Sequence, residues 1–416
     1  MRTRQKHTFF CFGLLFTLFL TGCIGVVEEI TPPPTITLAP TLTSLPTSTP
    51  VPARTSEPPT PVPVTPTTTQ SRPVTIGEIH MLTLTHGWAL DNSAVSRLLR
   101  TSDGGDTWQD MTPPLSTNDL TAPTAFFIDE QTGWVVYGLP LGMPAAESAV
   151  VVWHTADGGQ SWSASQPLNV AEAELFSPLF IQFATPQMGW LMAEVGAGMN
   201  HQYIMLFQTT DGGTNWVRVL DPFQPGPHSC PKTGMSFVEE GTGWITANCA
   251  GLMDGVFLNW TEDGGVSWTE RPLSPPAEDA NFFALPNGCY ADQPQLVSAQ
   301  NGRLTIHCQN FDTNAESNFL YQTTDGGQTW QIYPYPGGQL IFINDQIALA
   351  LGKTIHKTVN GGQTWEQIST VSWEGQFTFA DEMHGWAVAR EGEEIALVKT
   401  EDGGQSWQLV QPVSGE

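Results

Sequence analysis

The chain has 416 residues, and its 15 lysines and arginines against 41 aspartates and glutamates give a formal net charge of −26. This deficit of cations excludes a nucleic-acid binder that relies on phosphate contacts, and it excludes a polybasic binder of membrane surfaces. The 40 glycines and 33 prolines argue against a helical bundle, while 40% hydrophobic residues argue against a fully disordered chain. We therefore expect a β-structure outside the cytoplasm.

The first 22 residues have the pattern of an export signal. Residues 1–7 are basic, and residues 8–20 form an apolar run that is too short to span a bilayer as a helix. The run ends in Leu20-Thr-Gly-Cys23, which resembles the bacterial lipobox. We expect residues 1–22 to be a lipoprotein signal peptide and Cys23 to carry the lipid that anchors the exported chain. The alternatives are an ordinary signal peptide with a chance cysteine, or a retained anchor.

The next segment, residues 23–73, is rich in threonine and proline. Residues 31–73 alone contain 13 prolines and 13 threonines, and they have almost no side chains that could pack in a core. Such a sequence favours extended, polyproline-type backbone. We expect a disordered tether that separates the lipid from the folded domain. The mature chain, without three cations of the signal peptide, carries 12 basic and 41 acidic residues, a net charge of −29.

From residue 74 onward, one eight-residue pattern recurs seven times: Thr, any residue, Asp, Gly, Gly, any residue, a small polar residue, Trp. Its conserved acidic position and its tryptophan are Asp103 and Trp108, Asp157 and Trp162, Asp211 and Trp216, Asp263 and Trp268, Asp325 and Trp330, Asn360 and Trp365, Asp402 and Trp407. The mean spacing is about 50 residues, as expected for a four-stranded propeller blade. Asp-Gly-Gly supplies a side-chain acceptor and two residues that tolerate positive φ, so the pattern predicts a tight turn between two strands.

A second pattern precedes most of these turns. Gly-Trp occurs at Trp88, Trp134, Trp190, Trp244 and Trp386, and a phenylalanine stands seven residues before four of these tryptophans. Each repeat then contains four antiparallel strands. The sequence predicts an all-β domain at residues 74–416, a seven-bladed β-propeller. The first and last blades each contain a whole repeat, so the sequence does not decide how the ring closes; packing between them without strand exchange is one way.

These motifs resemble the Asp-box, or BNR repeat, of sialidase-type β-propellers, and the combination with Gly-Trp is most similar to photosystem II stability/assembly-factor-like propellers. The resemblance implies that the aspartates and tryptophans of the turns are structural. It also implies a non-enzymatic protein that binds a partner at the outer side of a membrane. Those propellers bind through a basic face, whereas this one contains only six arginines and four lysines.

Four cysteines lie in the predicted propeller, and both Cys230–Cys249 and Cys289–Cys308 are separated by 19 residues. The midpoint of each pair falls on the predicted turn between the first two strands of a blade. The two cysteines of each pair should therefore face each other across antiparallel strands and form a disulfide. The alternatives are free thiols or a metal site, although no Cys-x-x-Cys spacing supports zinc.

No residue pattern indicates a catalytic centre, a metal site or a cofactor. The acids of the turns lie on different blades, whereas glycoside hydrolysis needs two carboxylates within about 10 Å. Trp153 and Trp260 fall outside both motifs, so we expect them to be partly exposed on a third strand, with His154 and His356 on a solvated strand face. Four acid pairs lie on connecting loops: Glu172 and Glu174, Glu278 and Asp279, Asp381 and Glu382, Glu393 and Glu394.

The sequence therefore favours a monomeric, lipid-anchored binding or scaffold module on the outer side of the cytoplasmic membrane, on the cell surface or on an outer membrane. Its expected partner is a protein at that membrane, and it is not expected to bind nucleic acid. The alternative is a sialidase-like or other glycoside hydrolase, or a carbohydrate-binding propeller, acting on surface glycans. The sequence does not identify the ligand, and the binding residues are unknown at this stage.

Overall fold

The computed structural model describes residues 72–93, 96–115, 121–140, 142–143, 149–238, 241–252 and 255–415. They belong to one compact unit, Thr67–Glu416. Cys23, the predicted signal peptide and nearly all of the predicted tether lie outside the described residues. The described residues contain strands and turns but no helix, and so none that could cross a bilayer.

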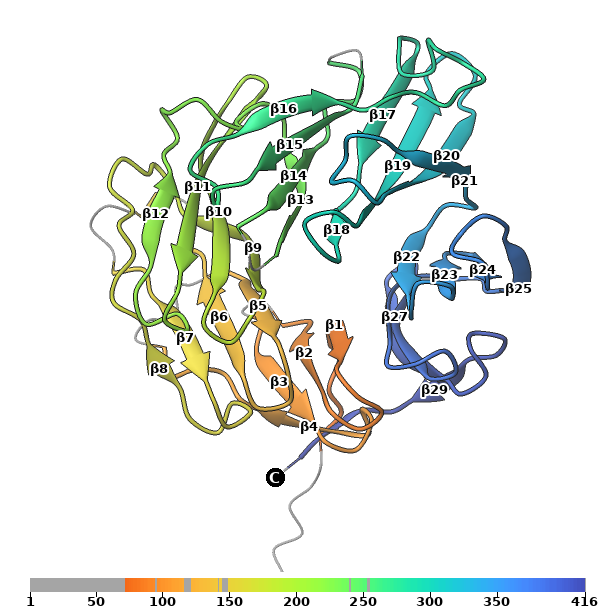
Figure 1. Ribbon diagram of the computed structural model, residues 1–416. Coiled ribbons are helices and arrows are strands. Elements are labelled where there is room, and N and C mark those ends of the chain that lie inside the picture. Colours follow the sequence, from red (N-terminus) through yellow and green to blue (C-terminus); the bar gives the residue numbers. More distant parts are fainter. Residues whose placement is uncertain are drawn as a thin grey trace, which may run out of the picture. The chain divides into compact units, whose positions relative to one another are not determined.

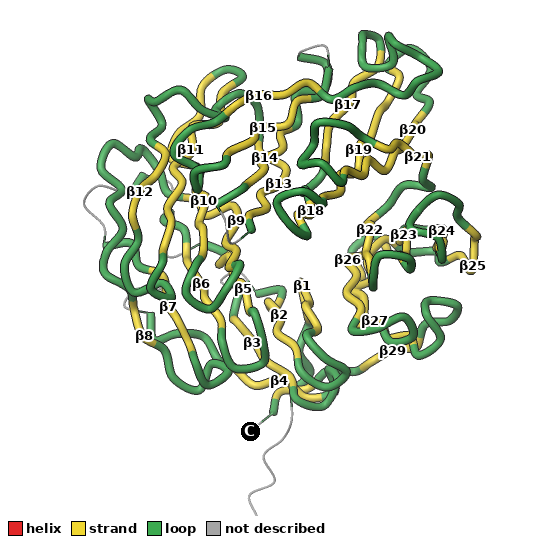
Figure 2. Tube along the Cα trace, in the orientation of Figure 1, coloured by secondary structure: helices red, strands yellow, loops and turns green. Residues whose placement is uncertain are grey.

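Seven antiparallel sheets are arranged as the blades of a β-propeller, as predicted (Figure 1). Each blade begins with its innermost strand and proceeds outward along the chain, so consecutive strands pair with each other (Figure 2). Blade 1 contains β1 (Ile76–Met81), β2 (Gly87–Asp91), β3 (Leu98–Thr101) and β4 (Thr107–Asp110). Blade 2 contains β5 (Pro123–Phe127), β6 (Gly133–Tyr137), β7 (Val152–Thr155) and β8 (Ser163–Ala164).

Blades 3, 4 and 5 follow in chain order. Blade 3 contains β9 (Ser177–Phe183), β10 (Gly189–Gly198), β11 (His201–Thr209) and β12 (Val217–Leu220). Blade 4 contains β13 (Lys232–Phe237), β14 (Gly243–Ala247), β15 (Phe257–Thr261) and β16 (Thr269–Pro272). In blade 5, β17 (Asn287–Ala291) and β18 (Gln295–Leu296) share the first position and both pair with β19 (Gly302–Asn310), which is followed by β20 (Glu316–Thr323) and β21 (Gln331–Pro334).

The last two blades complete the ring. Blade 6 contains β22 (Gln339–Phe342), β23 (Ala348–Leu351), β24 (Thr354–Thr358) and β25 (Glu366–Thr370). Blade 7 contains β26 (Glu374–Phe379), β27 (Gly385–Glu391), β28 (Glu394–Thr400) and β29 (Gln408–Val410). A final strand, β30 (Val413–Ser414), follows them. The hydrophobic core consists of clusters between neighbouring blades, such as the one that joins Trp134 of blade 2 to Phe183 and Phe207 of blade 3.

The glycine of each Gly-Trp pair is explained by its partner across the first two strands. Phe183 pairs with Gly189, and a Cβ built on Gly189 would lie 2.6 Å from the ring of Phe183. The same relation holds for Gly243, where a Cβ would lie 2.2 Å from the ring of Phe237. The phenylalanine ring therefore occupies the space that a side chain would need. The tryptophan that follows is buried between blades, and the indole of Trp190 stacks on Phe237 of blade 4 with ring centroids 4.4 Å apart.

The structure settles how the ring closes, which the sequence left open: a C-terminal strand joins the first blade. β30 pairs in parallel with β4, the outermost strand of blade 1. The backbone N–H of Ser414 donates to the carbonyl of Arg72, and that of Val74 donates to the carbonyl of Pro412. Closure is possible without exchanging a blade strand because the chain continues past β29 and adds a fifth strand to an already complete blade. Beside this seam, Trp108 is almost fully buried in a cluster with Trp386, Val388 and Leu397 of blade 7.

Candidate binding face

The seven Asp-Gly-Gly turns have one hydrogen-bond pattern, which makes them structural. In the turn of blade 2, the hydroxyl of Thr155 donates to Oδ1 of Asp157, and the N–H of Gly159 donates to that hydroxyl at 2.8 Å. Both the N–H and the hydroxyl of Ser161 donate to the same carboxylate. The pattern recurs at Asn360, whose Oδ1 accepts the N–H of Thr364 at 3.0 Å. Both glycines of every turn have positive φ.

These hydrogen bonds make the turn aspartates poor general acids. The side-chain and backbone hydrogen bonds from Ser161 lower the pKa of Asp157 to about 2, and those from Thr329 lower the pKa of Asp325 to about 2. A general acid requires a raised pKa. Although burial acts in the opposite direction, hydrogen bonds also lower the pKa of the turn aspartates Asp103, Asp211, Asp263 and Asp402 and of Asp91 and Asp381.

The tryptophans of both motifs lie in the seams between blades or against the turns. Trp386 of blade 7 donates its indole N–H to the carbonyl of Gly104 in the turn of blade 1, at 2.8 Å. Trp134 and Trp190 donate in the same way to the turn of the following blade. Trp260, which we expected to be partly exposed, is 6% exposed because the guanidinium of Arg271 covers its ring at 3.2 Å. None of these rings forms an open stacking platform.

Of the loop acids that suggested a glycosidase, Glu172, Asp381 and Glu382 are engaged locally. Glu172 forms an ion pair with Arg218 at 3.1 Å, and Glu382 with Lys357 at 3.7 Å. Asp381 accepts hydrogen bonds from the backbone of Met383 and His384, which form the next turn. The six arginines do not converge either, and each has its own contact: Arg97 with Asp91, Arg100 with Gly158, Arg218 with Asp221, Arg271 with Trp260, Arg303 with Asp345 and Arg390 with Gly77.

A polar cavity of about 180 Å³ lies between blades 1 and 2, on the side of the Asp-Gly-Gly turns. Trp88, Arg100, Glu130 and Asp157 contribute to its wall. The carboxylate of Asp157 is held by its own turn, so Glu130 has no second free carboxylate in this wall. The cavity can accept a polar group but does not contain the pair that hydrolysis requires. No group of three or more His, Cys, Asp or Glu side chains in the described part of the chain is placed to hold a metal ion.

The face opposite the Asp-Gly-Gly turns is different. Because the strands of a blade alternate in direction, the loops between second and third strands share this face with the links from one blade to the next. We call the described loop residues of blades 3, 4 and 5 on this side the braced face: residues 198–201, 221–231, 248–252, 255–256, 273–286 and 311–315.

Both disulfides lie at the braced face and have the expected pairing. Cys289 of β17 is directly opposite Cys308 of β19. Cys230 precedes β13 and is bonded to Cys249, which follows β14. A small pocket between them is lined by both Cys249 and Cys289, together with Gly226 of the link into blade 4. Cys230–Cys249 therefore braces two loops of this face, and Cys289–Cys308 joins the two paired strands whose ends lie at it.

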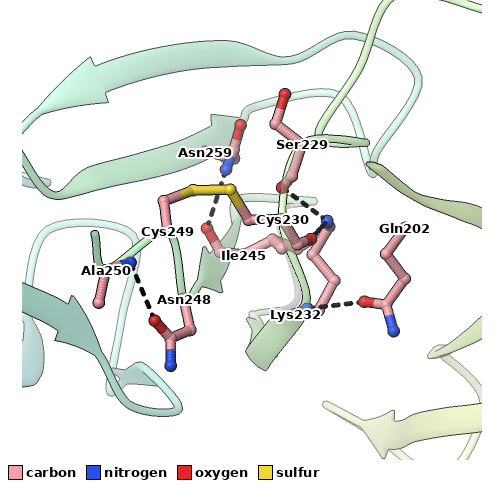
Figure 3. Close-up of a disulfide and its surroundings, with 9 residues drawn as sticks. All are labelled: Gln202, Ser229, Cys230, Lys232, Ile245, Asn248, Cys249, Ala250 and Asn259. Carbon is pink, nitrogen blue, oxygen red and sulfur yellow. Dashed lines mark hydrogen bonds between the residues drawn. A yellow bond between two sulfur atoms is a disulfide. The ribbon is translucent and has the colours of Figure 1, made fainter. Parts of the chain in front are cut away.

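Lys232 lies beneath the first disulfide, as Figure 3 shows. It is 8% exposed, and its ammonium group donates to the carbonyls of Ser229 and Cys230. Its backbone N–H donates to Oε1 of Gln202 in blade 3 at 2.7 Å. Burial lowers the pKa of Lys232 to about 7, against the opposing charge of Glu194. Lys232 thus holds the link between blades 3 and 4 from below, and nothing in the sequence pattern had singled it out.

A second polar cluster that the sequence did not reveal lies between blades 5 and 6. His307 of β19 contacts the carboxylate of Asp292, the side-chain oxygen of Asn318 and the hydroxyl of Tyr335. Although burial disfavours its protonation, the hydrogen bond and charge of Asp292 raise the pKa of His307. These residues come from separate strands and links, so their spacing carries no motif. The cluster ties blade 5 to the link into blade 6.

Five large apolar side chains are exposed on the braced face. They are Met199, Phe223, Leu252, Leu285 and Phe311, and their exposed fractions range from 49% for Phe311 to 104% for Met199. The other exposed large apolar residues of the described part are Leu84, Val217, Val266, Val297, Val359, Met383 and Leu409, which lie on the Asp-Gly-Gly side or on outer strands. Scattered single residues of that kind are normal on protein surfaces.

Comparisons with known proteins agree with this architecture. No family model matches the chain. A xyloglucanase from Paenibacillus sp. is 25% identical over 278 residues, which are 61% of this chain and 25% of that protein. The photosystem II assembly lipoprotein Ycf48 from Synechococcus sp. strain CC9902 is 28% identical over 142 residues, which are 34% of this chain and 36% of that protein.

Among solved structures, Ycf48 bound to a D1 peptide superposes with a TM-score of 0.51 and 17% identity, covering 80% of this chain and 96% of that one. The aligned parts span 25% and 36% of the two sequence relatives. At these identities the likeness establishes the architecture, and the chain is a seven-bladed β-propeller similar in structure to Ycf48.

Proposed function

We propose that this protein is a non-enzymatic binding module, held outside the cytoplasm by a lipid on Cys23, and that it engages a protein partner through the braced face. The observation that carries the proposal is that both disulfides and the five large exposed apolar side chains occur on one face of blades 3–5. The similarity to Ycf48, solved with a bound D1 peptide, supports a protein partner.

Crosslinking in the native membrane followed by pull-down tests this proposal. We expect the wild-type chain to capture one protein reproducibly, and we expect the double variant Leu285→Ser, Phe311→Ser to lose it. The matched control is Val297→Ser, Val359→Ser, which removes exposed apolar side chains from other positions. Capture that is equal in all three proteins, or absent in the wild type, contradicts the proposal.

The lipid anchor has its own test, because it lies outside the described residues. With Cys23→Ser, the chain should move from the membrane fraction to the soluble extracytoplasmic fraction without loss of the fold. A membrane-bound Cys23→Ser chain would show that another segment anchors the protein.

A glycan-directed activity is the second candidate, since the similarity to the Paenibacillus xyloglucanase favours it. Incubation with xyloglucan, followed by measurement of new reducing ends, tests hydrolysis. We expect none, because Glu172, Asp381 and Glu382 are engaged locally and Glu130 has no free partner carboxylate in its cavity. Reducing ends that disappear in Glu130→Gln would establish the glycosidase instead.

A further inference from the structure

The exposed apolar residues of blades 4 and 5 are adjacent rather than scattered. The ring of Phe311 lies over two glycines, and a Cβ built on Gly251 or Gly288 would be 3.3 Å or 2.2 Å from it. Leu252 follows Gly251 directly. The backbone N–H of Phe311 donates to the carbonyl of Pro286, next to Leu285. Leu252, Leu285 and Phe311 therefore surround one place on the braced face.

Met199 and Phe223 belong to loops that are joined to the same place. Asn200, next to Met199, accepts the backbone N–H of Cys230 through its carbonyl at 2.7 Å. Cys230 is bonded to Cys249, three residues before Leu252. The link that contains Phe223 continues through Gly226 into the small pocket between the disulfides. Covalent bonds and backbone hydrogen bonds thus connect all five loops.

This bracing makes the exposed apolar side chains suited to binding. Loops that are already ordered lose little conformational entropy when they bind, so their apolar contacts convert into affinity efficiently. Exposed Phe, Leu and Met side chains on such loops otherwise reduce solubility, and a rigid apolar patch rimmed by polar residues marks an interaction site.

The charges around the patch are negative. Exposed carboxylates on the braced face are Glu278, Asp279 and Asp312, and Glu316 lies beside it at the start of β20. The neighbouring cations are not available to a ligand, because Lys232 is buried and Arg218 is paired with Glu172 and Asp221. Such a rim repels anionic lipid headgroups and attracts lysine and arginine.

We infer that the braced face binds an apolar polypeptide stretch that is flanked by lysine or arginine. The five apolar side chains bind the centre of the stretch, and the loop carboxylates select its basic flanks. This inference rests on the proposed function and names the chemistry of its partner.

Fluorescence anisotropy with defined peptides tests the inference. The first peptide has leucine and phenylalanine at its centre and two lysines at each end; the second has glutamates at its ends; the third has serine and glycine at its centre. The protein is the full chain carrying Cys23→Ser. We expect the first peptide to bind at least about tenfold more tightly than either of the others, a difference of about 1.4 kcal/mol. Binding should weaken as salt concentration rises.

The variants decide whether the braced face is the binding site. Leu285→Ser, Phe311→Ser should lose about tenfold in affinity for the first peptide, whereas Val297→Ser, Val359→Ser should not change it. Circular dichroism melting confirms that both remain folded. Equal affinity for the lysine-ended and glutamate-ended peptides, or equal affinity of the two variants, overturns the inference.

Two other occupants of the face give distinct results. If the wild type forms a dimer in sedimentation experiments and Leu285→Ser, Phe311→Ser does not, the face is an interface between copies of this chain, and the inference fails. If the Cys23→Ser chain binds phosphatidylglycerol vesicles through the same residues, the occupant is a lipid surface, and the inference fails again. When pull-down depends on the face but the peptides do not discriminate, the partner chemistry is wrong while the proposed function stands.

Discussion

The side-chain amide of Gln376 binds both backbone groups of Ile79, donating to its carbonyl at 2.8 Å and accepting its N–H at 3.0 Å. Gln376 belongs to β26 of the last blade and Ile79 to β1 of the first, so these bonds join blades that no peptide link connects directly. Gln339 binds Phe377 in the same manner between blades 6 and 7. Glutamine side chains thus extend the hydrogen bonding of one innermost strand to the next.

Gln376→Ala should therefore destabilise the ring at its seam. We expect a loss of about 1–3 kcal/mol in the free energy of unfolding, because two half-buried backbone groups lose their partner. Urea unfolding followed by tryptophan fluorescence measures this loss. The control is Gln160→Ala on an exposed turn, which should change stability by less than about 0.5 kcal/mol. Equal effects of the two substitutions would refute the role of the Gln376–Ile79 contact.

The closing strand β30 makes a second prediction. Val413 donates its backbone N–H to the carbonyl of Asp106 at 3.1 Å, so Val413→Pro removes a ladder hydrogen bond. We expect a loss of about 1–2 kcal/mol in the free energy of unfolding, because the carbonyl of Asp106 loses its partner. Val413→Thr retains the N–H and is the matched control in urea unfolding. Equal free energies of unfolding for the two variants would show that this hydrogen bond does not contribute to ring closure.

The turns predict a dependence on acid. The folded-state pKa of Asp325 is about 2 against an ordinary value of 3.8, so its hydrogen bonds stabilise the fold above about pH 4. That stabilisation is lost as pH falls from about 4 toward 2. The melting temperature of Asp325→Asn should fall less steeply over this range than that of the wild type, because Asn360 shows that an amide also satisfies the turn. Melting temperatures between pH 2 and pH 5 measure it; parallel curves for both proteins would contradict it.

Removing the Cys289–Cys308 disulfide should lower both the stability of the fold and the affinity for the peptide. Each closes a loop with a sequence separation of 19, for which chain entropy gives about 3 kcal/mol. Replacing Cys289 and Cys308 by serine should reduce the free energy of unfolding by about this amount. It should also weaken binding of the lysine-ended peptide, since the loop around Phe311 loses its brace. A stable variant with unchanged peptide affinity would show that bracing does not matter.

Lys232 predicts that the stability of the fold changes with pH in the alkaline range. Burial lowers its folded pKa to about 7, whereas the unfolded value is 10.5, so the unfolded chain binds more protons between these values. The stability of the wild type relative to Lys232→Met should therefore rise as pH increases from 7 to 10. Chemical unfolding of both proteins at several pH values measures the difference. A constant difference would mean that the amine is protonated throughout or solvated.

Motif spacing was sufficient for the blades. The seven Asp-Gly-Gly turns and the Phe–Gly-Trp pairs predict strand order and antiparallel pairing because their causes are local: positive φ, side-chain caps, and a ring that lies over a glycine. The pairing of Cys289 with Cys308 also followed from sequence, since two residues equidistant from a hairpin turn must face each other. The expectation that Trp260 is partly exposed was wrong because Arg271, which covers its ring, lies on the next strand.

By itself, the sequence determined a seven-bladed propeller with structural turns and two disulfides, since each repeat contains its own turn chemistry and hydrophobic pattern. Only the tertiary structure decided how the low-cation chain uses its few charges and where its exposed apolar residues gather. Arginines that looked available are each engaged, and Lys232 is buried beneath a disulfide. Met199, Phe223, Leu252, Leu285 and Phe311 lie on one face because loops between second and third strands and links between blades share that face, an arrangement that the propeller's strand order creates and no local pattern encodes.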